Sequence, residues 1–258
     1  MSGLFLLSGL FMFDLDLIRG LEERCFNAWP TLRTLHMGGW VLRLADGHTR
    51  RANSASPLHD STLSADEIIA SVVRLFREAE LTPIFRTTPL APEGFDEKLA
   101  AEGWREDDLA WGMLCDDISA GGPSSDVAIE PKPSEAWLRD AMVAYGHGEA
   151  GERALRRTLA QLAMPGAFAT VHADGKPLAW GLGVYERGYV GLYDLVVAPE
   201  ARGKGVGRRL VSSLITWGRD QGAHAAYLQV RDSNHAARHL YRSFGFRDVY
   251  RYSNRALD

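Results

Sequence analysis

The sequence is poor in cysteine, has no long uninterrupted apolar run and carries no excess of positive charge. Cys25 and Cys115 are the two cysteines among 258 residues. This pair provides neither a disulfide framework nor a metal-ligand spacing, so we expect no metal site. A reducing compartment, the cytoplasm, is the simplest location. The net charge of −4 argues against nucleic acid as a partner, because nucleic-acid-binding domains are usually strongly basic.

The N-terminal segment MSGLFLLSGLFMF, residues 1–13, is apolar. It is far too short to span a bilayer, and a secretory signal would need a basic segment and a small-residue cleavage site. We therefore expect no membrane partner. We interpret the segment as a dispensable extension with Met12 as the natural first residue, which an intact-mass measurement on the untagged protein would test.

Charge is divided unevenly along the chain. Residues 1–120 hold 11 Lys and Arg against 19 Asp and Glu, a net −8, whereas residues 121–258 hold 18 against 14, a net +4. The basic excess falls in the half that contains a glycine-rich stretch, which suits a small anionic ligand. The acidic half would favour a cationic second substrate through long-range attraction.

Turn signals and apolar patterns divide the chain into two similar runs joined by SAGGPSSD at 119–126. The first predicts a helix at 14–28, strands around Asp46-Gly47, a helix at 64–80 opened by the capping box of Ser64 and Glu67, a strand at 83–88 and a short helix ending in LAAEGW. The second predicts a strand at 126–130, helices at 134–145 and 150–162, three strands turning at Asp174-Gly175 and near Gly188, a helix at 206–221, a strand at 225–230, a helix at 234–244 and strands within 246–254.

The two runs resemble an internal repeat. ADG recurs at 45–47 and 173–175, and the helix end LAAEGW (99–104) matches YRSFGF (241–246). Aligned in this way, the first copy lacks a segment equivalent to about 190–205. The prediction is an α/β protein of two tandem halves with a mixed sheet in each, and coincidental turn and helix-end patterns are the alternative.

The stretch VVAPEARGKGVGRRL at 196–210 predicts an anion site. Free amides and the positive end of the dipole at a helix N-terminus attract phosphate, and glycines let several amides converge. The G-x-G-x-G spacing does not fit a dinucleotide fingerprint, and Lys204 is followed by glycine rather than by the Ser or Thr of a nucleotide-binding P-loop. A glycine-rich turn with solvated basic residues is the other interpretation of the stretch taken alone.

RGKGVG after DLVVAPEA is similar to the [RQ]-x-x-G-x-[GA] motif of the GNAT superfamily of N-acetyltransferases, and the following helix, strand and NHAARHLYRSFGF segment keep the family's order. The resemblance covers about residues 126–254. It implies a GNAT domain at 126–258 and, if the repeat is real, a degenerate GNAT-like domain at 1–118 with a linker at 119–125. The implied co-substrate is acetyl-CoA, from which an acetyl group passes directly to a primary amine in a ternary complex.

The acceptor would be a small molecule or a peptide, and a homodimer is compatible with the sequence. The alternative to an enzyme is a non-catalytic acyl-CoA-binding sensor or scaffold. The resemblance assigns the diphosphate of acetyl-CoA to the loop residues, and the pantetheine arm to the strand end and the next helix start. The loop residues are Arg202, Gly203, Lys204, Gly205, Val206 and Gly207. The residues assigned to the pantetheine arm are Val196, Val197 and Asn234. Asn234 is also a suitable N-cap for the helix that follows it.

Tyr241 is the catalytic acid that the resemblance implies, because a phenol stays protonated at neutral pH and can donate to the departing sulfur. Packing in the core is its other role. The matching residue of the first copy is Leu99, so we expect that copy to be catalytically empty. Asp194 is one candidate base, and His147 and Glu149 are the others. Arg51 and Asn53 either line a groove shared by the two halves or belong to an ordinary polar loop.

Overall fold

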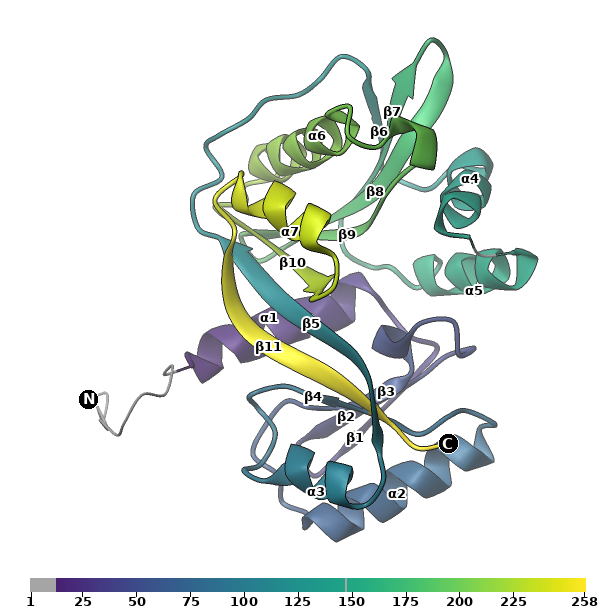
Figure 1. Cartoon of the computed structure of the whole chain (residues 1–258), viewed down its shortest axis with the longest axis vertical. Coiled ribbons are helices and arrows are strands. Elements are labelled where there is room, and N and C mark those ends of the chain that lie inside the picture. The colour runs from purple at the N-terminus through teal and green to yellow at the C-terminus, as the bar shows by residue number, and fades with distance from the viewer. Residues whose placement is uncertain (1–12, 147) are drawn as a thin grey trace.

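The computed structural model describes residues 13–146 and 148–258 (Figure 1). The predicted start at Met12 lies outside the described residues. Within them the strands form one sheet of 11 strands in the order β1-β2-β3-β4-β11-β5-β10-β9-β8-β7-β6. The α/β class with a mixed sheet is confirmed, but the expectation of a separate sheet in each half is wrong, because the sheet runs through both.

The first half, residues 13–118, begins with a helix, and five strands and two further helices follow it. Its elements are α1 (Leu15–Ala28), β1 (Arg33–Met37), β2 (Trp40–Leu44), the 3-10 turn η1 (Arg50–Ala52), β3 (Ser54–Pro57), α2 (Ala65–Glu78), β4 (Ile84–Thr87), α3 (Phe95–Ala101) and β5 (Arg105–Cys115). Ser64 and Glu67 form the predicted capping box at the start of α2.

The second half, residues 126–258, follows the predicted order of elements closely. They are β6 (Val127–Glu130), α4 (Glu135–Tyr145), α5 (Glu149–Leu159), β7 (Gly166–Ala173), β8 (Lys176–Glu186), β9 (Tyr189–Val197), the 3-10 turn η2 (Pro199–Ala201), α6 (Val206–Asp220), β10 (Ala225–Arg231), α7 (His235–Arg242) and β11 (Arg247–Ala256). The turns at Asp174-Gly175 and Gly188 lie where they were expected, with positive φ at these positions.

The halves exchange two long strands, β5 and β11. β5 of the first half lies between β10 and β11, antiparallel to both, and β11 of the second half pairs with β4 of the first. Figure 1 shows β5 and β11 running side by side between the upper and lower parts of the molecule. The sequence did not reveal β5, because its acidic start at Glu106 and Asp107 is unfavourable in a strand. The boundary at 119–125 stays a prediction.

The topology repeats, but in a different register from the predicted one. β3, α2, β4, α3 and β5 follow one another as β9, α6, β10, α7 and β11 do, and each set has a parallel pair around its first helix. Asp174-Gly175 joins β7 to β8, whereas Asp46-Gly47 lies between β2 and β3. The two ADG turns are therefore not equivalent, and the turn matching Asp174-Gly175 is Gly38-Gly39.

The two helix ends identified from the sequence do correspond. Gly103 and Gly245 both have positive φ, of 86° and 91°. The N–H of Trp104 donates to the carbonyl of Leu99 over 3.0 Å, and the N–H of Phe246 donates to that of Tyr241 over 3.2 Å. Leu99 thus occupies the position in α3 that Tyr241 occupies in α7.

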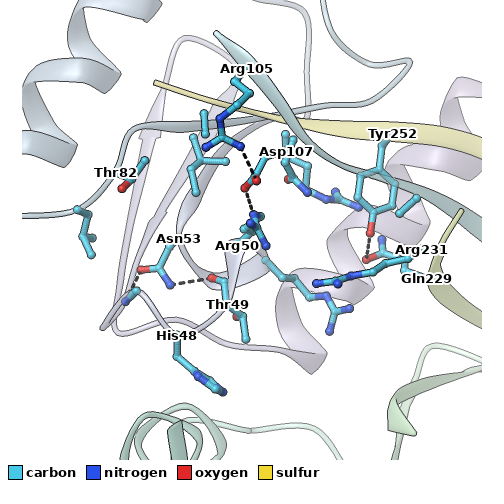
Figure 2. A pocket seen from close by; sticks show the side chains of 18 of the residues that line it. His48, Thr49, Arg50, Asn53, Thr82, Arg105, Asp107, Gln229, Arg231 and Tyr252 are labelled. Carbon is cyan, nitrogen blue, oxygen red and sulfur yellow. Dashed lines mark hydrogen bonds and ion pairs between the residues drawn. The ribbon is translucent and has the colours of Figure 1, made fainter. Parts of the chain in front are cut away.

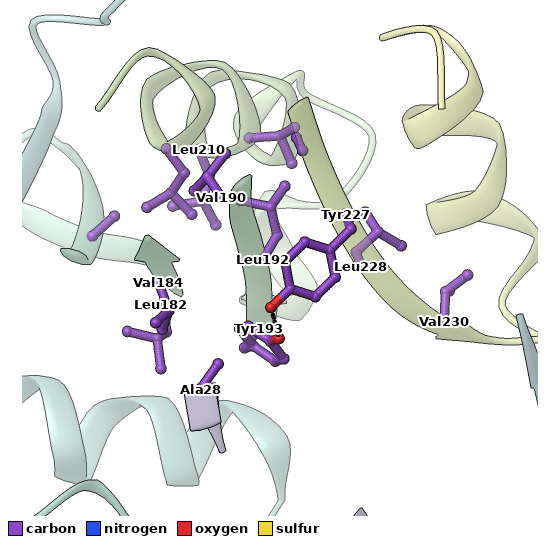
Figure 3. Close-up of a cluster of buried hydrophobic side chains, with 14 of the residues drawn as sticks. Ala28, Leu182, Val184, Val190, Leu192, Tyr193, Leu210, Tyr227, Leu228 and Val230 are labelled. Atoms are coloured by element: carbon purple, nitrogen blue, oxygen red, sulfur yellow. Dashed lines mark hydrogen bonds between the residues drawn. The ribbon is translucent and has the colours of Figure 1, made fainter. Parts of the chain in front are cut away.

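Buried apolar side chains form two clusters. The smaller lies in the first half around Trp40, Phe85 and Phe95. The larger belongs to the second half but also takes in the buried face of α1, including Cys25 and Ala28. Figure 3 shows Ala28 beside side chains of the second half's strands. The first helix of the chain therefore packs into the core of the second half.

Helices α4 and α6 cover opposite faces of the second half's strands (Figure 1). Trp137 of α4 packs edge-on against Phe168 of β7, which pairs with Leu182 of β8. A Cβ at the next residue, Gly181, would meet Leu210 and Leu214 of α6 instead. Successive residues of a strand point to opposite faces, so the sheet lies between the helices. No helix among the described residues combines the length and apolar composition that spanning a bilayer requires.

Candidate active site

Strands β9 and β10 part from each other halfway along their length. Their parallel pairing runs from Tyr189 with Ala225 to Leu192 with Leu228, and no pairing is recorded beyond it in the described residues. The hydroxyls of Tyr193 and Tyr227 are 2.6 Å apart near this point (Figure 3). Beyond it, the rest of β9 has no strand partner on this side among the described residues, so its backbone can pair with an extended ligand as with an added strand.

A β-bulge lies at the beginning of the separated part of β9. Tyr193 pairs with Leu182 and Val196 with Trp180, so Asp194 and Leu195 together face the single residue Gly181. A Cβ at Gly181 would approach the Leu195 side chain to 2.5 Å, which explains the glycine. Such bulges redirect a side chain out of the regular alternation.

Asp194 has a strained backbone and a shifted pKa. Its φ of 47° is rare for a residue other than glycine, although Asp tolerates the left-handed region better than most. Burial raises the pKa of its carboxyl to about 6, against the opposing effect of the Arg51 charge. At neutral pH this carboxylate is ionised and more basic than an ordinary aspartate, as a general base requires.

The N-terminus of α6 is open. Gly203 and Gly205 both have a φ of 74°, and Gly205 occupies the N-cap without any side-chain cap. Among the described residues, the amides from Gly203 to Gly207 donate no hydrogen bond to a carbonyl or side chain. The first turn of α6 also holds no acidic residue. These exposed donors at the positive end of a helix fit a phosphate group.

The equivalent helix of the first half is closed to an anion. Ser64 and Glu67 each accept from the other's backbone N–H in a reciprocal capping box at the start of α2, and Asp66 adds a second carboxylate to the first turn. The predicted absence of a ligand loop in the first half agrees with this geometry.

Basic side chains surround the opening of α6. The Nε of Arg202 donates to the carbonyl of Val197 over 3.2 Å, and Arg208 donates to Ser243 over 2.8 Å. Lys204 is exposed at the tip of the turn. Val196 and Val197 lie on the separated part of β9, as predicted.

Tyr241 lies on the buried face of α7 against Phe246. Burial raises the pKa of its phenol to about 12, so the hydroxyl remains protonated and able to donate. Asn234 caps the same helix by accepting from the Ala237 N–H over 3.1 Å. It also lines the cavity described next, so the structure gives it both a capping role and access to a ligand.

A cavity of about 880 Å³, the central cavity, lies between the two halves (Figure 2). Asp194, Gln229 and Asn234 line it from the second half, and Arg51 and Asn53 from the first. The groove interpretation of Arg51 and Asn53 is therefore confirmed. Figure 2 shows Arg50, Asp107 and Arg105 linked in a row along one wall, with Tyr252 donating to Gln229 on another.

The other candidate bases do not gain support from this geometry. Glu149 starts α5, is almost fully exposed and pairs with Arg153 at 3.6 Å rather than lining the central cavity. His147 lies outside the described residues. Of the proposed bases that the structure describes, Asp194 is the one that lines the cavity.

Sequence reasoning missed Tyr145 at the end of α4. It lines the central cavity and also a second hollow of about 580 Å³ beside Trp180. Burial, and the nearby charges of Asp194 and Tyr241, raise the pKa of its phenol well above the ordinary value. The sequence signal for Tyr145 is the following Gly146, which ends the helix. The proximity of Tyr145 to Asp194 arises only from the fold.

An open helix N-terminus beside separated parallel strands, with a perturbed carboxyl and a protonated phenol nearby, defines an acyltransferase that uses an acyl-CoA. The family model described as "Probable histone acetyltransferase Rv0428c C-terminal" matches residues 16–254. The chain belongs to the GNAT family of N-acetyltransferases.

A curated relative and two solved structures extend the likeness over both halves. The chain is 28% identical over 242 residues to the uncharacterized N-acetyltransferase YobR of Bacillus subtilis (strain 168), covering 91% of this chain and 96% of that protein. A GCN5-related N-acetyltransferase from Kribbella flavida superposes with a TM-score of 0.66 at 15% identity, covering 95% and 96% of the two chains. A tandem GNAT protein from the clavulanic acid biosynthesis pathway gives a TM-score of 0.62 at 15% identity, covering 94% and 87%. The two solved structures show the likeness of fold.

Proposed function

We propose that the protein transfers an acetyl group from acetyl-CoA to a primary amine by direct attack in a ternary complex. The observation that carries the proposal is the common location of three features. Asp194 lines the central cavity, and the separated part of β9 and then the open start of α6 follow it directly along the chain.

The donor site uses mainly backbone groups. The amides from Gly203 to Gly207 bind the diphosphate of acetyl-CoA, and Arg202 and Lys204 contribute positive charge. Val196 and Val197 pair with the amide groups of the pantetheine arm. This arrangement directs the thioester toward Asp194 and leaves the central cavity for the acceptor.

Asp194 accepts the proton that the acceptor ammonium must lose before its nitrogen attacks the thioester carbonyl. The new C–N bond forms as the C–S bond breaks, and Tyr241 donates a hydrogen bond to the sulfur that leaves with the electron pair. After the attack the nitrogen still carries one proton more than the amide product, and this proton and the one on Asp194 both pass to solvent. A phenol with a pKa of about 12 stabilises the thiolate by donation while keeping its own proton at neutral pH.

Direct transfer agrees with the state of the cysteines. Cys25 and Cys115 are both free and buried, and burial raises the pKa of the Cys25 thiol to about 11. The thiol of Cys115 donates to the carbonyls of Asp117 and Phe244. Neither offers a reactive thiolate for a covalent acyl-enzyme.

The test is acetyl-CoA turnover with a panel of amines, monitored by release of the CoA thiol. The proposal predicts amine-dependent release together with an N-acetylated product detected by mass. Tight binding of acetyl-CoA without release on any amine would instead support a non-catalytic acyl-CoA sensor.

A further inference from the structure

The central cavity is rich in arginine, in contrast to the acidic first half as a whole. Five arginines and three aspartates line it among the described residues. Several of these charges neutralise one another: Arg50 and Arg105 both pair with Asp107, and Arg105 also reaches Asp258 at 3.2 Å. Arg86 forms a buried ion pair with Glu22. The long-range attraction of a cationic acceptor that the net charge predicted is therefore not reproduced inside the cavity.

Arg51 differs from these paired arginines. Within residues 13–146 and 148–258 its guanidinium donates no hydrogen bond and has no carboxylate within 4 Å. It is half-buried and lies over the rings of Trp29 and Tyr193, at 5.7 and 5.5 Å from their centroids. Aromatic stacking of this kind holds a guanidinium in place and leaves its N–H groups available.

The backbone that carries Arg51 is also fixed. It lies in the single turn η1, whose N-cap Thr49 accepts from the Ala52 N–H. Buried Arg43 donates to the carbonyl of Arg51. Burial lowers the pKa of the Arg51 guanidinium, but the charges of Tyr252, Asp194, Cys25 and Tyr193 together outweigh this effect and raise the pKa above the ordinary value. The cation is thus held permanently at the cavity wall.

Arg51 and Asp194 are close enough for each charge to affect the other, yet they form no ion pair within 4 Å. A molecule with an ammonium and a carboxylate a few ångströms apart would satisfy both groups at once. A guanidinium binds a carboxylate through two parallel hydrogen bonds, and the ammonium would then lie at the base that deprotonates it.

We propose that the acceptor is an amino acid, or a similarly short amine with a free carboxylate, bound with its carboxylate on Arg51 and its amine at Asp194. This inference rests on the proposed function and specifies the substrate class. The cavity volume of about 880 Å³ leaves room for the side chain, since small-molecule sites typically occupy about 300–1,000 Å³.

The experiment compares each of the common L-amino acids with its C-terminal amide, which keeps the amine and removes the negative charge. Rates of CoA release are compared at equal concentrations of the free amine, because amidation lowers the amine pKa. We expect at least one amino acid to exceed its amide by about tenfold or more in kcat/KM. In Arg51→Gln the KM for that amino acid should rise about 10- to 100-fold with a smaller effect on kcat, and Arg51→Lys should recover part of the loss.

Arg33→Gln is the matched control, because Arg33 is an exposed arginine of β1 that does not line the cavity. It should retain the wild-type preference. Amides that react as well as the amino acids, or an Arg51→Gln protein with unchanged KM, would overturn the inference while leaving the acetyltransferase proposal intact.

A measurement without turnover separates the two failures. Saturation-transfer difference NMR on the CoA-saturated protein reports binding of the same amino acids and amides. If no amine is acetylated, the proposed function fails, and the NMR comparison still decides the inference. Contact signals for an amino acid that disappear in Arg51→Gln support it, and equal signals in both proteins, or none, contradict it.

Discussion

Asp194 is the residue where backbone strain, burial and charge coincide. A bulge gives it a φ of 47°, and burial gives its carboxyl a pKa near 6. Strain of this kind persists where the surrounding structure imposes it and is frequent at functional sites. The sequence identified Asp194 as one base among three, but the bulge and the Arg51 charge that distinguish it arise only from tertiary contacts.

The activity should depend on pH through Asp194. Below about pH 6 the carboxyl is protonated and cannot accept a proton, so kcat/KM should fall about tenfold for each further pH unit. Asp194→Asn, which keeps a residue tolerant of left-handed backbone, should lower kcat/KM by about 10²-fold and abolish this acidic limb. A pH profile of CoA release measures both, and an Asn variant with wild-type activity would exclude Asp194 as the base.

Asp194→Asn should lower activity but raise the stability of the folded protein at alkaline pH. A pKa raised in the folded state means that the Asp194 contribution to stability is full below its unfolded pKa of about 3.9 and is lost as pH rises through about 6. Asp194→Asn should therefore raise Tm at pH 8 and have little effect at pH 4. Thermal unfolding at the two pH values tests this, and a lower Tm at pH 8 would contradict it.

Tyr241→Phe removes one hydroxyl from a buried ring. If this hydroxyl donates to the departing sulfur, kcat should fall about 10²-fold while the Kd for acetyl-CoA stays unchanged. Tyr185→Phe, at the far end of β8, should leave both unchanged. Steady-state kinetics and a binding titration separate the two quantities, and an unaltered kcat would remove the assigned acid.

At the scale of elements, the contrast between α6 and α2 decides where the donor binds. The glycines and basic residues before α6 predicted an open helix start, and the Ser64 and Glu67 pattern predicted a closed one; both are short-range patterns that the sequence contains in full. β5 and the register of the repeat were misjudged because they depend on partners far along the chain. Gly112 of β5, for example, faces Tyr250 of β11, where a Cβ would approach the ring to 2.2 Å.

At the scale of the whole molecule, exchanged strands and a buried polar network join the halves. Glu22 of α1 accepts from Arg86 of β4, from Gln229 of β10 over 3.0 Å and from Tyr250 of β11. The ring of Tyr252 also lies 3.8 Å from the Arg86 guanidinium carbon. The network supports the walls of the central cavity, since Arg86, Gln229 and Tyr252 all line it.

Glu22→Gln should be strongly destabilising. It leaves the buried Arg86 charge uncompensated, which typically costs about 3–5 kcal/mol. The double variant Glu22→Gln/Arg86→Met should recover much of this free energy because it removes both charges. Urea unfolding followed in parallel by fluorescence and circular dichroism measures the effect, and a Glu22→Gln protein as stable as wild type would show that the network does not hold the halves together.

The most direct test of the account is a calorimetric titration with acetyl-CoA. We predict one site per chain, weakened at least about 100-fold by Gly205→Glu, which places a carboxylate at the anion site. Gly94→Glu is the control, because Gly94 is also a helix N-cap with φ 75° and ψ 0°, against 74° and 2° at Gly205, and it should bind as wild type does. Two sites per chain, or unchanged binding in Gly205→Glu, would contradict the assignment of the α6 N-terminus as the acetyl-CoA site.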